Sequence, residues 1–165
     1  APILCSCLSC QLRYPMGLMD LYFAYGSNMN IEQMKRRCPG ASLKEQGYIL
    51  NWRYFINGNG YAGIERREGS VVFGGIWELQ DFHWVSLDQY EAVDQGFYQK
   101  VKVTVSAGDL VRSEEVDASL YLSNNYEYGK PSSAYQKIVM QGGHDLKLKK
   151  DYLQFLEKWG KGPPV

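Results

Sequence analysis

The stretch Leu21-Tyr22-Phe23-Ala24-Tyr25-Gly26-Ser27-Asn28 organises the rest of the chain. Its apolar and aromatic first half is too short for a helix and predicts a buried strand. The second half predicts a sharp turn that opens a helix, because Gly26 lacks a side chain and Ser27 and Asn28 are good N-cap residues. Such a turn gathers backbone N–H groups and can hold a small anion, such as a carboxylate or a phosphate. An ordinary strand–turn–helix connection is the alternative interpretation.

The overall composition indicates one globular domain and argues against several kinds of partner. The chain has 165 residues, of which 45% are hydrophobic and 22% charged, as is typical of folded proteins. Lys plus Arg equals Asp plus Glu at 18 each, so we expect neither a nucleic acid nor a membrane as a partner. The 13 tyrosines favour either a pocket lined with hydroxyl groups or, more simply, an aromatic β-rich core.

The first residues differ from the rest of the chain in their cysteine content. We interpret residues 1–19 as a flexible N-terminal extension and residues 20–165 as a single domain. The extension holds three of the four cysteines: Cys5, Cys7 and Cys10. Their spacing suits a soft metal, but His83 and His144 are distant and complete no four-ligand pattern, so no metal is expected. Cys38 alone in the remaining chain favours a reducing, cytoplasmic location without disulfides.

Sequence patterns along the chain predict an α+β fold with a small, mostly antiparallel, barrel-like sheet flanked by helices. The expected helices cover residues 29–37, 82–93, 134–140 and 146–159, and the expected strands lie within 21–24, 41–61, 62–65, 70–79, 98–105 and 116–122. Asp81 is the expected N-cap of the second helix. Arg66 to Gly69 is expected to be a polar loop, and Gly142-Gly143 is expected to stop the third helix.

Two details of these elements bear on the fold near the opening stretch. Asn30 and Gln33 resemble a capping box at the start of the first helix, and the basic residues Lys35 to Arg37 suit its C-terminus. Gly74-Gly75 within a strand marks a bulge, a barrel corner or a close approach of a ligand. We favour the barrel corner.

The residues available for catalysis are few, and Glu91 is the most suggestive of them. The chain shows no Ser-His-Asp set, and the Gly-x-Gly-x-x-Gly pattern at Gly58–Gly63 lies in a hairpin turn rather than before a helix. Aromatic residues surround Glu91 in the sequence, notably Tyr90 and Phe97. An apolar environment raises the pKa of a carboxylate, which suits a general base near neutral pH. A solvated glutamate at a helix end is the alternative.

Three blocks in this order resemble the gamma-glutamylcyclotransferase family, and the resemblance covers residues 21–159. The blocks are Leu21–Asn28; Leu87-Asp88 and Glu91 with Gly96 and Tyr98; and Tyr121–Glu127 with Pro131-Ser132 and Tyr135–Val139. The resemblance implies a barrel-centred α+β domain that cyclises a γ-glutamyl compound to 5-oxoproline and releases the attached amine. It also implies that no cofactor is used, that the partner is a small-molecule γ-glutamyl substrate, and that a homodimer is possible.

By the same resemblance, Glu91 is the catalytic base, and Tyr135 is the best candidate for direct contact with the substrate. The implied substrate-binding residues are Tyr22, Phe23, Ala24, Tyr25, Gly26, Ser27, Asn28, Tyr98, Tyr121 and Tyr135. Ala92 departs from the pattern, since many relatives have glycine there. If this position needs a positive φ, alanine costs roughly 1 kcal/mol and shifts Glu91 slightly.

Two other functions fit the same residues. A sister enzyme would act on glutathione, on a γ-glutamylamine or on a γ-glutamyl natural product. The Tyr25-Gly26-Ser27-Asn28 sequence argues against the γ-glutamylamine branch, which resembles Tyr-Gly-Thr-Leu at this point. A non-catalytic domain that binds a small ligand is the other alternative, and the intact Glu91 argues against it.

Overall fold

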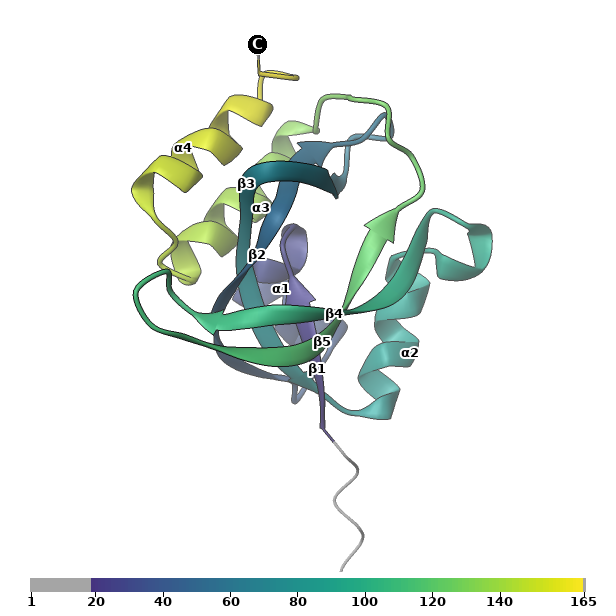
Figure 1. Cartoon of the computed structure of the whole chain (residues 1–165). Coiled ribbons are helices and arrows are strands. Elements are labelled where there is room, and N and C mark those ends of the chain that lie inside the picture. Colours follow the sequence, from purple (N-terminus) through teal and green to yellow (C-terminus); the bar gives the residue numbers. More distant parts are fainter. Residues whose placement is uncertain (1–18, 165) are drawn as a thin grey trace, which may run out of the picture.

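The computed structural model describes residues 19–164, which form a barrel of five strands with helices packed around it (Figure 1). The strands are β1 (Asp20–Ala24), β2 (Ser42–Ile56), β3 (Ala62–Leu79), β4 (Tyr98–Gly108) and β5 (Ser113–Ser123). They close in the order β1-β3-β2-β4-β5. Every pairing is antiparallel except that of β1 with β5. The predicted fold class is confirmed. The predicted extension, residues 1–19, lies outside the described residues except for Met19.

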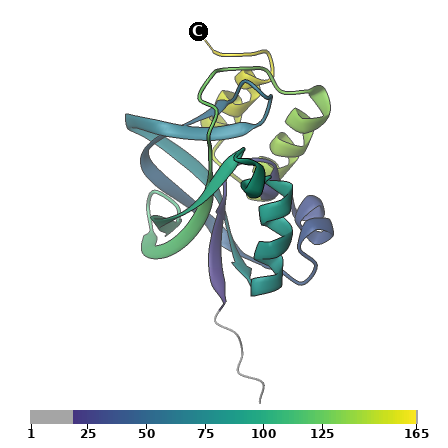
Figure 2. The same ribbon diagram turned by 90° about the vertical axis from the view of Figure 1, so that its right-hand side faces the viewer.

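The helices lie on two sides of the barrel. They are η1 (Ser27–Met29), α1 (Ile31–Arg37), α2 (Asp81–Tyr90), η2 (Val93–Gln95), α3 (Ser133–Asp145) and α4 (Lys150–Trp159). In Figure 1, α3 and α4 pack together on one side, and α2 lies on the other. Figure 2 shows α1 beside α2. The Ser86 hydroxyl of α2 donates to the Arg37 carbonyl at 2.6 Å, which joins the end of α1 to α2.

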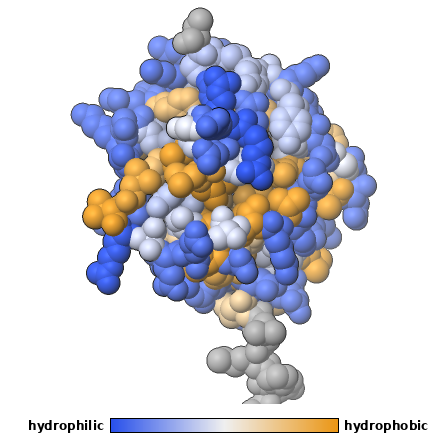
Figure 3. All heavy atoms as spheres, in the orientation of Figure 1, coloured by the Kyte–Doolittle hydropathy of each residue, from blue (hydrophilic) through white to orange (hydrophobic). Residues whose placement is uncertain are grey.

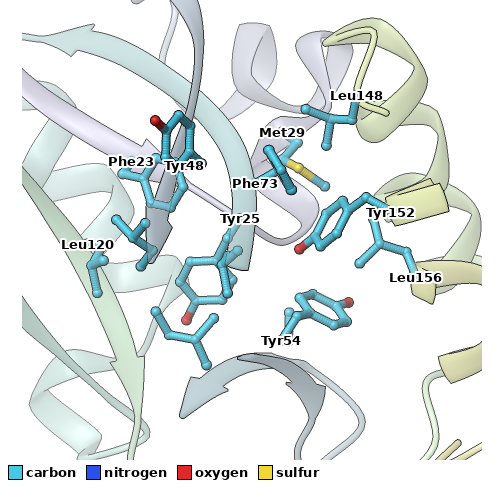
Figure 4. Close-up of a cluster of buried hydrophobic side chains, with 14 of the residues drawn as sticks. Phe23, Tyr25, Met29, Tyr48, Tyr54, Phe73, Leu120, Leu148, Tyr152 and Leu156 are labelled. Atoms are coloured by element: carbon cyan, nitrogen blue, oxygen red, sulfur yellow. The ribbon is translucent and has the colours of Figure 1, made fainter. Parts of the chain in front are cut away.

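Strand β1 divides the core because its side chains alternate between two faces. Phe23 and Tyr25 point into the larger cluster, which contains Tyr152 and Leu156 of α4 (Figure 4). Tyr22 and Ala24 join the smaller cluster, which contains Trp84 and Leu87 of α2. The predicted apolar stripe of the last helix is confirmed by its buried members Tyr152, Leu156 and Trp159. The opening stretch therefore contacts both helical layers and ends between them.

The predicted loop from Arg66 to Gly69 is wrong, because β3 continues through it as one strand of 18 residues. The irregularity lies in the pairing of β2 with β3, whose register shifts between Leu50 and Trp52. At this point Asn51 adopts a φ of 65°, and its side chain accepts a hydrogen bond from Gly69 N at 3.0 Å. The polar residues thus lie in an exposed, irregular part of a strand rather than in a break.

Helix boundaries also differ from the predictions, because contacts from outside each helix decide them. Helix α2 is capped by Gln80 rather than Asp81, in a capping box with His83. Helix α3 does not stop at Gly142-Gly143 but continues to Asp145. A Cβ atom at Gly142 would lie 2.7 Å from Asn30 N, so glycine here allows helix α3 to pack against the start of α1. Helix α4 begins at Lys150 rather than near residue 146.

The surface is mostly polar on the face shown in Figure 3, with an apolar band across its middle. The large hydrophobic side chains that remain exposed include three aromatic residues of the cavity described below, Tyr61, Tyr90 and Phe97. The β4–β5 loop also exposes Leu110 and Val111. Among residues 19–164 no helix combines the length and apolar character needed to cross a bilayer.

Candidate active site

A cavity of about 320 Å³ opens where the turn after β1 meets the end of α2. This volume suits a small organic ligand. The cavity is lined by Tyr22, Tyr25, Gly26, Ser27, Asn28, Arg37, Tyr61, Ala62, Tyr90, Glu91, Ala92, Gln95, Phe97, Tyr98, Tyr121 and Tyr135. The structure therefore brings together the predicted base and nearly all of the predicted substrate-binding residues.

Phe23 and Ala24 are the two predicted site residues that do not line the cavity. Both are almost fully buried, and their side chains pack in the larger and the smaller core cluster, respectively. The prediction took the whole of the opening stretch as the substrate-binding segment. Both residues belong to β1, which is part of the core and leads into the turn. Their packing fixes the position of the turn. We therefore correct their role from substrate binding to packing.

Asn28 connects the turn to Glu91 through a side-chain amide whose hydrogen-bonding groups all have partners. Its Nδ2 donates to the Tyr22 hydroxyl at 2.9 Å and to Glu91 Oε1 at 3.2 Å. Its Oδ1 accepts from Gln33 Nε2 at 3.1 Å and from Arg37 Nη1 at 3.0 Å. An amide offers two donors and two acceptor positions, so the four contacts fix its orientation. Asn28 therefore holds Glu91 in place, rather than presenting a free side chain to a ligand.

The first helix begins at Ile31 rather than at Met29 as predicted, with Asn30 as the predicted N-cap, but only half of the predicted capping box forms. Asn30 Oδ1 accepts from Gln33 N at 2.9 Å, as expected for an N-cap. The Gln33 side chain turns away and donates instead to Ser27 Oγ at 2.8 Å, in addition to its bond with Asn28. The helix thus stabilises the turn from behind.

Glu91 lies just past the end of α2, as the C-cap residue, rather than in its last turn as predicted. Ala92 follows with a φ of 49°, the left-handed conformation that glycine adopts more readily. This turn directs the carboxylate into the cavity. Burial raises the pKa of Glu91 to about 7, while the positive charge of Arg37 and the hydrogen bond from Asn28 act to lower it. A carboxyl group with a pKa near neutrality is able both to accept and to return a proton.

Three of the cavity tyrosines use their hydroxyl protons within the protein. Tyr25 donates to the backbone carbonyl of Tyr121. Tyr98 donates to the carbonyl of Ala62 at 2.6 Å, and Tyr121 donates to Asp88 Oδ1 at 2.6 Å. Burial raises the pKa of each of these hydroxyls well above its ordinary value. These residues therefore shape the wall of the cavity as neutral, fixed groups.

Tyr135 of α3 differs, because the hydrogen bond found for its hydroxyl within residues 19–164 is one that it accepts. Ala62 N donates to this oxygen at 3.1 Å, which leaves the hydroxyl proton to be donated elsewhere. Burial raises the pKa of Tyr135 to about 12, so the group remains a donor at neutral pH. Its ring packs edge-on against Tyr61, with the ring centroids 5.2 Å apart. Tyr135 thus keeps its hydroxyl proton for donation to a ligand, as does Tyr22, whose hydroxyl accepts from Asn28 Nδ2.

Sequence reasoning missed several residues of the cavity. Arg37 was interpreted only as a favourable charge at the end of α1, yet it lines the cavity. Its guanidinium lies over the Tyr90 ring, with Cζ 4.3 Å from the ring centroid. Tyr61, which follows the hairpin turn, was also missed. Spacing gave no signal for either residue, because the fold alone brings them together.

Metal-binding residues do not gather in the part of the chain that the structure describes, where no group of three or more His, Cys, Asp and Glu side chains forms. The Cys5, Cys7 and Cys10 set lies outside the described residues. Cys38 is buried, its Sγ contacts the His83 carbonyl, and burial raises the pKa of its thiol to about 11. This environment does not favour a reactive thiolate.

The fold and the cavity define a class of protein: a barrel-centred α+β domain whose small-molecule site contains a partly buried carboxylate. Comparison with known proteins gives the family. Residues 71–156 match the AIG2-like family. The mouse protein named gamma-glutamylcyclotransferase is 31% identical over 86% of this chain and 79% of its own length. The human protein of the same name is 29% identical over 83% of this chain and 77% of its own length. The chain belongs to the gamma-glutamylcyclotransferase family, which is a family of enzymes.

Solved structures agree with this membership. A structure named gamma-glutamyl cyclotransferase has a TM-score of 0.77 and 29% identity, and the match covers 84% of this chain and 86% of that chain. A yeast protein described as a gamma-glutamyl cyclotransferase specific to glutathione has a TM-score of 0.57 and 10% identity. This match covers 87% of this chain and 96% of that chain. The second similarity shows a shared fold alone.

Proposed function

We propose that this protein is a gamma-glutamylcyclotransferase that converts a γ-glutamyl amino acid into 5-oxoproline and the free amino acid. The observation that carries the proposal is Glu91, a carboxyl group with a pKa near 7 that faces a cavity walled by tyrosines and the Gly26–Asn28 turn. Family membership supports the same activity. The reaction requires one group that accepts and returns a proton, and Glu91 is the titratable carboxyl group in the described cavity lining.

In the proposed mechanism, the turn binds the α-carboxylate of the substrate. Ser27 and Asn28 begin η1, so their N–H groups have no acceptor within that helix. A Cβ atom at Gly26 would lie 2.8 Å from the Ala62 Cβ and 3.3 Å from the Tyr135 hydroxyl, so glycine here allows both residues to pack against the turn. Tyr135 donates to a substrate oxygen from beside the turn, where its hydroxyl lies 3.3 Å from the Cβ position of Gly26. Because the reaction is intramolecular, much of the catalytic effect comes from holding the folded conformer in which the amine lies against the γ-carbonyl.

The chemical steps then follow from proton transfer at Glu91. The carboxylate removes a proton from the substrate α-ammonium, and the free amine attacks the γ-carbonyl carbon to form the new C–N bond. Donors at the turn stabilise the oxyanion that develops, a role in which one donor is worth on the order of 3 kcal/mol. The protonated Glu91 then gives its proton to the departing nitrogen as the original amide C–N bond breaks. The regenerated carboxylate accepts the second proton of the ring nitrogen and passes it to the released amine, so the lactam leaves neutral and the amine leaves as an ammonium ion. The products are the lactam and the free amine.

A panel of three substrates tests the proposal and its alternatives. We expect 5-oxoproline from γ-glutamyl-alanine, and much less from glutathione and from the γ-glutamylamine ε-(γ-glutamyl)-lysine. A preference for glutathione or for the amine would assign the protein to a sister activity. Formation of 5-oxoproline from none of them, measured by chromatography, would favour a binding domain of the same fold. The proposal also includes a cytoplasmic location and a homodimer, which fractionation and light scattering test.

The pH dependence should report the Glu91 pKa and its control by Asn28. Glu91 acts as a base only when ionised, so kcat/KM of the wild type should fall about tenfold per pH unit below pH 7. The Asn28 hydrogen bond lowers this pKa. The Asn28→Asp variant removes the donor and adds a negative charge, so its acid limb should move to higher pH, while activity recovers in alkaline buffer. An acid limb unchanged from wild type would contradict the positioning role of Asn28.

A further inference from the structure

Among the residues that the structure describes, one cationic side chain lines the cavity, and the proposed mechanism leaves that side chain without a ligand. Within residues 19–164, Arg37 and Glu91 are the lining residues that carry a charge near neutral pH. A γ-glutamyl amino acid carries three charges: the ammonium and carboxylate of its glutamyl part, and the carboxylate of the leaving amino acid. If the proposed function holds, Glu91 serves the ammonium and the turn serves the first carboxylate. The second carboxylate needs a partner.

Arg37 is held in a fixed position by contacts that leave much of its guanidinium available. Its backbone carbonyl accepts from Ser86, Nη1 donates to Asn28, and Cζ lies 4.3 Å from the Tyr90 ring centroid. In the described part of the chain it belongs to neither of the two ion pairs found, Lys35–Glu32 and Lys100–Asp88. A guanidinium has five N–H donors in a planar fork that matches a carboxylate. One bond from Nη1 and one stacked face fix its plane, and within residues 19–164 no side-chain or backbone acceptor is found for Nε and Nη2.

The position of Arg37 also matches the end of the substrate that leaves. The walls formed by Tyr22, Tyr98 and Tyr121 are buried, whereas Tyr90 beneath the guanidinium is 57% exposed. Arg37 itself is half-buried. It therefore lies toward the open side of the cavity, next to Glu91, where the released amino acid departs.

We propose that Arg37 binds the carboxylate of the leaving amino acid and so selects γ-glutamyl α-amino acids over γ-glutamyl compounds whose leaving amine lacks a carboxylate. This inference rests on the proposed function and names the substrate class of the same site. It gives Arg37 a direct contact with the substrate in addition to its contact with Asn28.

Two substrates that differ in one group test this role: γ-glutamyl-alanine and γ-glutamyl-alaninamide, in which a neutral amide replaces the carboxylate. We expect the wild type to prefer the acid by roughly 10- to 100-fold in kcat/KM, as for a charged hydrogen bond. In Arg37→Gln the ratio of kcat/KM for the acid to kcat/KM for the amide should fall to about 1. In Arg37→Lys part of the preference for the acid should remain. Any loss that acts through Asn28 lowers both rates by the same factor, so the ratio isolates the carboxylate contact.

The matched control is Arg36→Gln, which removes an exposed arginine of the same helix that does not line the cavity and should keep the wild-type ratio. An Arg37→Gln variant that slows both substrates equally would overturn the inference and leave Arg37 with a positioning role only. Wild-type turnover of both substrates without preference would also overturn it, while leaving the proposed function intact. Turnover of neither substrate would contradict the proposed function and this inference together.

Discussion

Replacing Glu91 with glutamine is expected to lower kcat for γ-glutamyl-alanine by roughly 10²- to 10⁴-fold, the usual contribution of a general base. Glutamine keeps the shape of the side chain and its acceptor oxygen for Asn28 Nδ2, which lies 3.2 Å from Oε1 in the wild type. It cannot accept the ammonium proton or return one to the leaving nitrogen. The variant should therefore bind substrate and fail at the chemical step, which single-turnover measurements of 5-oxoproline would show.

The same variant should fold at least as well as the wild type, and the pH dependence of stability reveals why. Burial raises the pKa of Glu91 from its ordinary value of 4.5 to about 7 in the folded protein. Below pH 4.5 the carboxyl group is neutral in both states and has no effect on their balance. Above pH 7 it is charged in both states, and the folded state must hold a charge that burial disfavours. At pH 8, Glu91→Gln should therefore be as stable as the wild type or more so, and this difference should vanish toward pH 4.5.

Glu68→Gln provides the matched control, because it makes the same chemical change at an exposed position of β3. It should leave both kcat and the urea midpoint near their wild-type values. Wild-type turnover by Glu91→Gln would show that another group is the base. A large loss of stability at pH 8 would show that the Asn28 contact to the charged carboxylate outweighs the penalty of burial.

The sequence predicts the fold most reliably where local signals and tertiary contacts agree. Strand β1, the turn at Gly26, the N-cap at Asn30 and the apolar stripe of α4 each follow from residues close together in the chain. The misplaced boundaries have tertiary causes. Helix α3 continues past Gly142, where the glycine allows η1 and α1 to pack closely against it. The N-cap of α2 is Gln80, one residue before the predicted Asp81, because His83 Nδ1 accepts a hydrogen bond from Gln80 N.

The candidate site divides in a similar way between what a sequence pattern reveals and what only folding reveals. Glu91 and the turn stood out because each carries a local signature. The role of Asn28 did not, because its partners Gln33, Arg37 and Glu91 are assembled by two helices that meet only in the fold. Arg37 had a sufficient local explanation as a charge at a helix end, and that explanation concealed its position at the cavity.

Gly74 is a position in the barrel at which a single methyl group should strongly destabilise the fold. The Gly74-Gly75 pair lies in the middle of β3, where this strand pairs with both β1 and β2. Neither register shift between β2 and β3 falls at this pair, so it is not a bulge. A Cβ atom on Gly74 would lie 2.2 Å from the carbonyl oxygen of Ala24. The glycine thus marks a close approach of the protein backbone, and the barrel-corner interpretation does not explain it.

Gly74→Ala is expected to destabilise the protein by roughly 3 kcal/mol, at the upper end of the range for overpacking, because the atom it meets is backbone and cannot turn aside. The residue it would displace, Ala24, leads directly into the turn at Gly26, so activity should fall as well.

Gly75→Ala is the matched control in the same strand. Its Cβ would meet only the methyl ends of Leu146 at 3.0 Å and Leu43 at 3.3 Å, which are able to shift. We expect Gly75→Ala to change stability by less than about 1 kcal/mol, because a strand favours alanine over glycine. Urea unfolding followed by circular dichroism measures both variants, and equal midpoints for them would refute the close-approach argument.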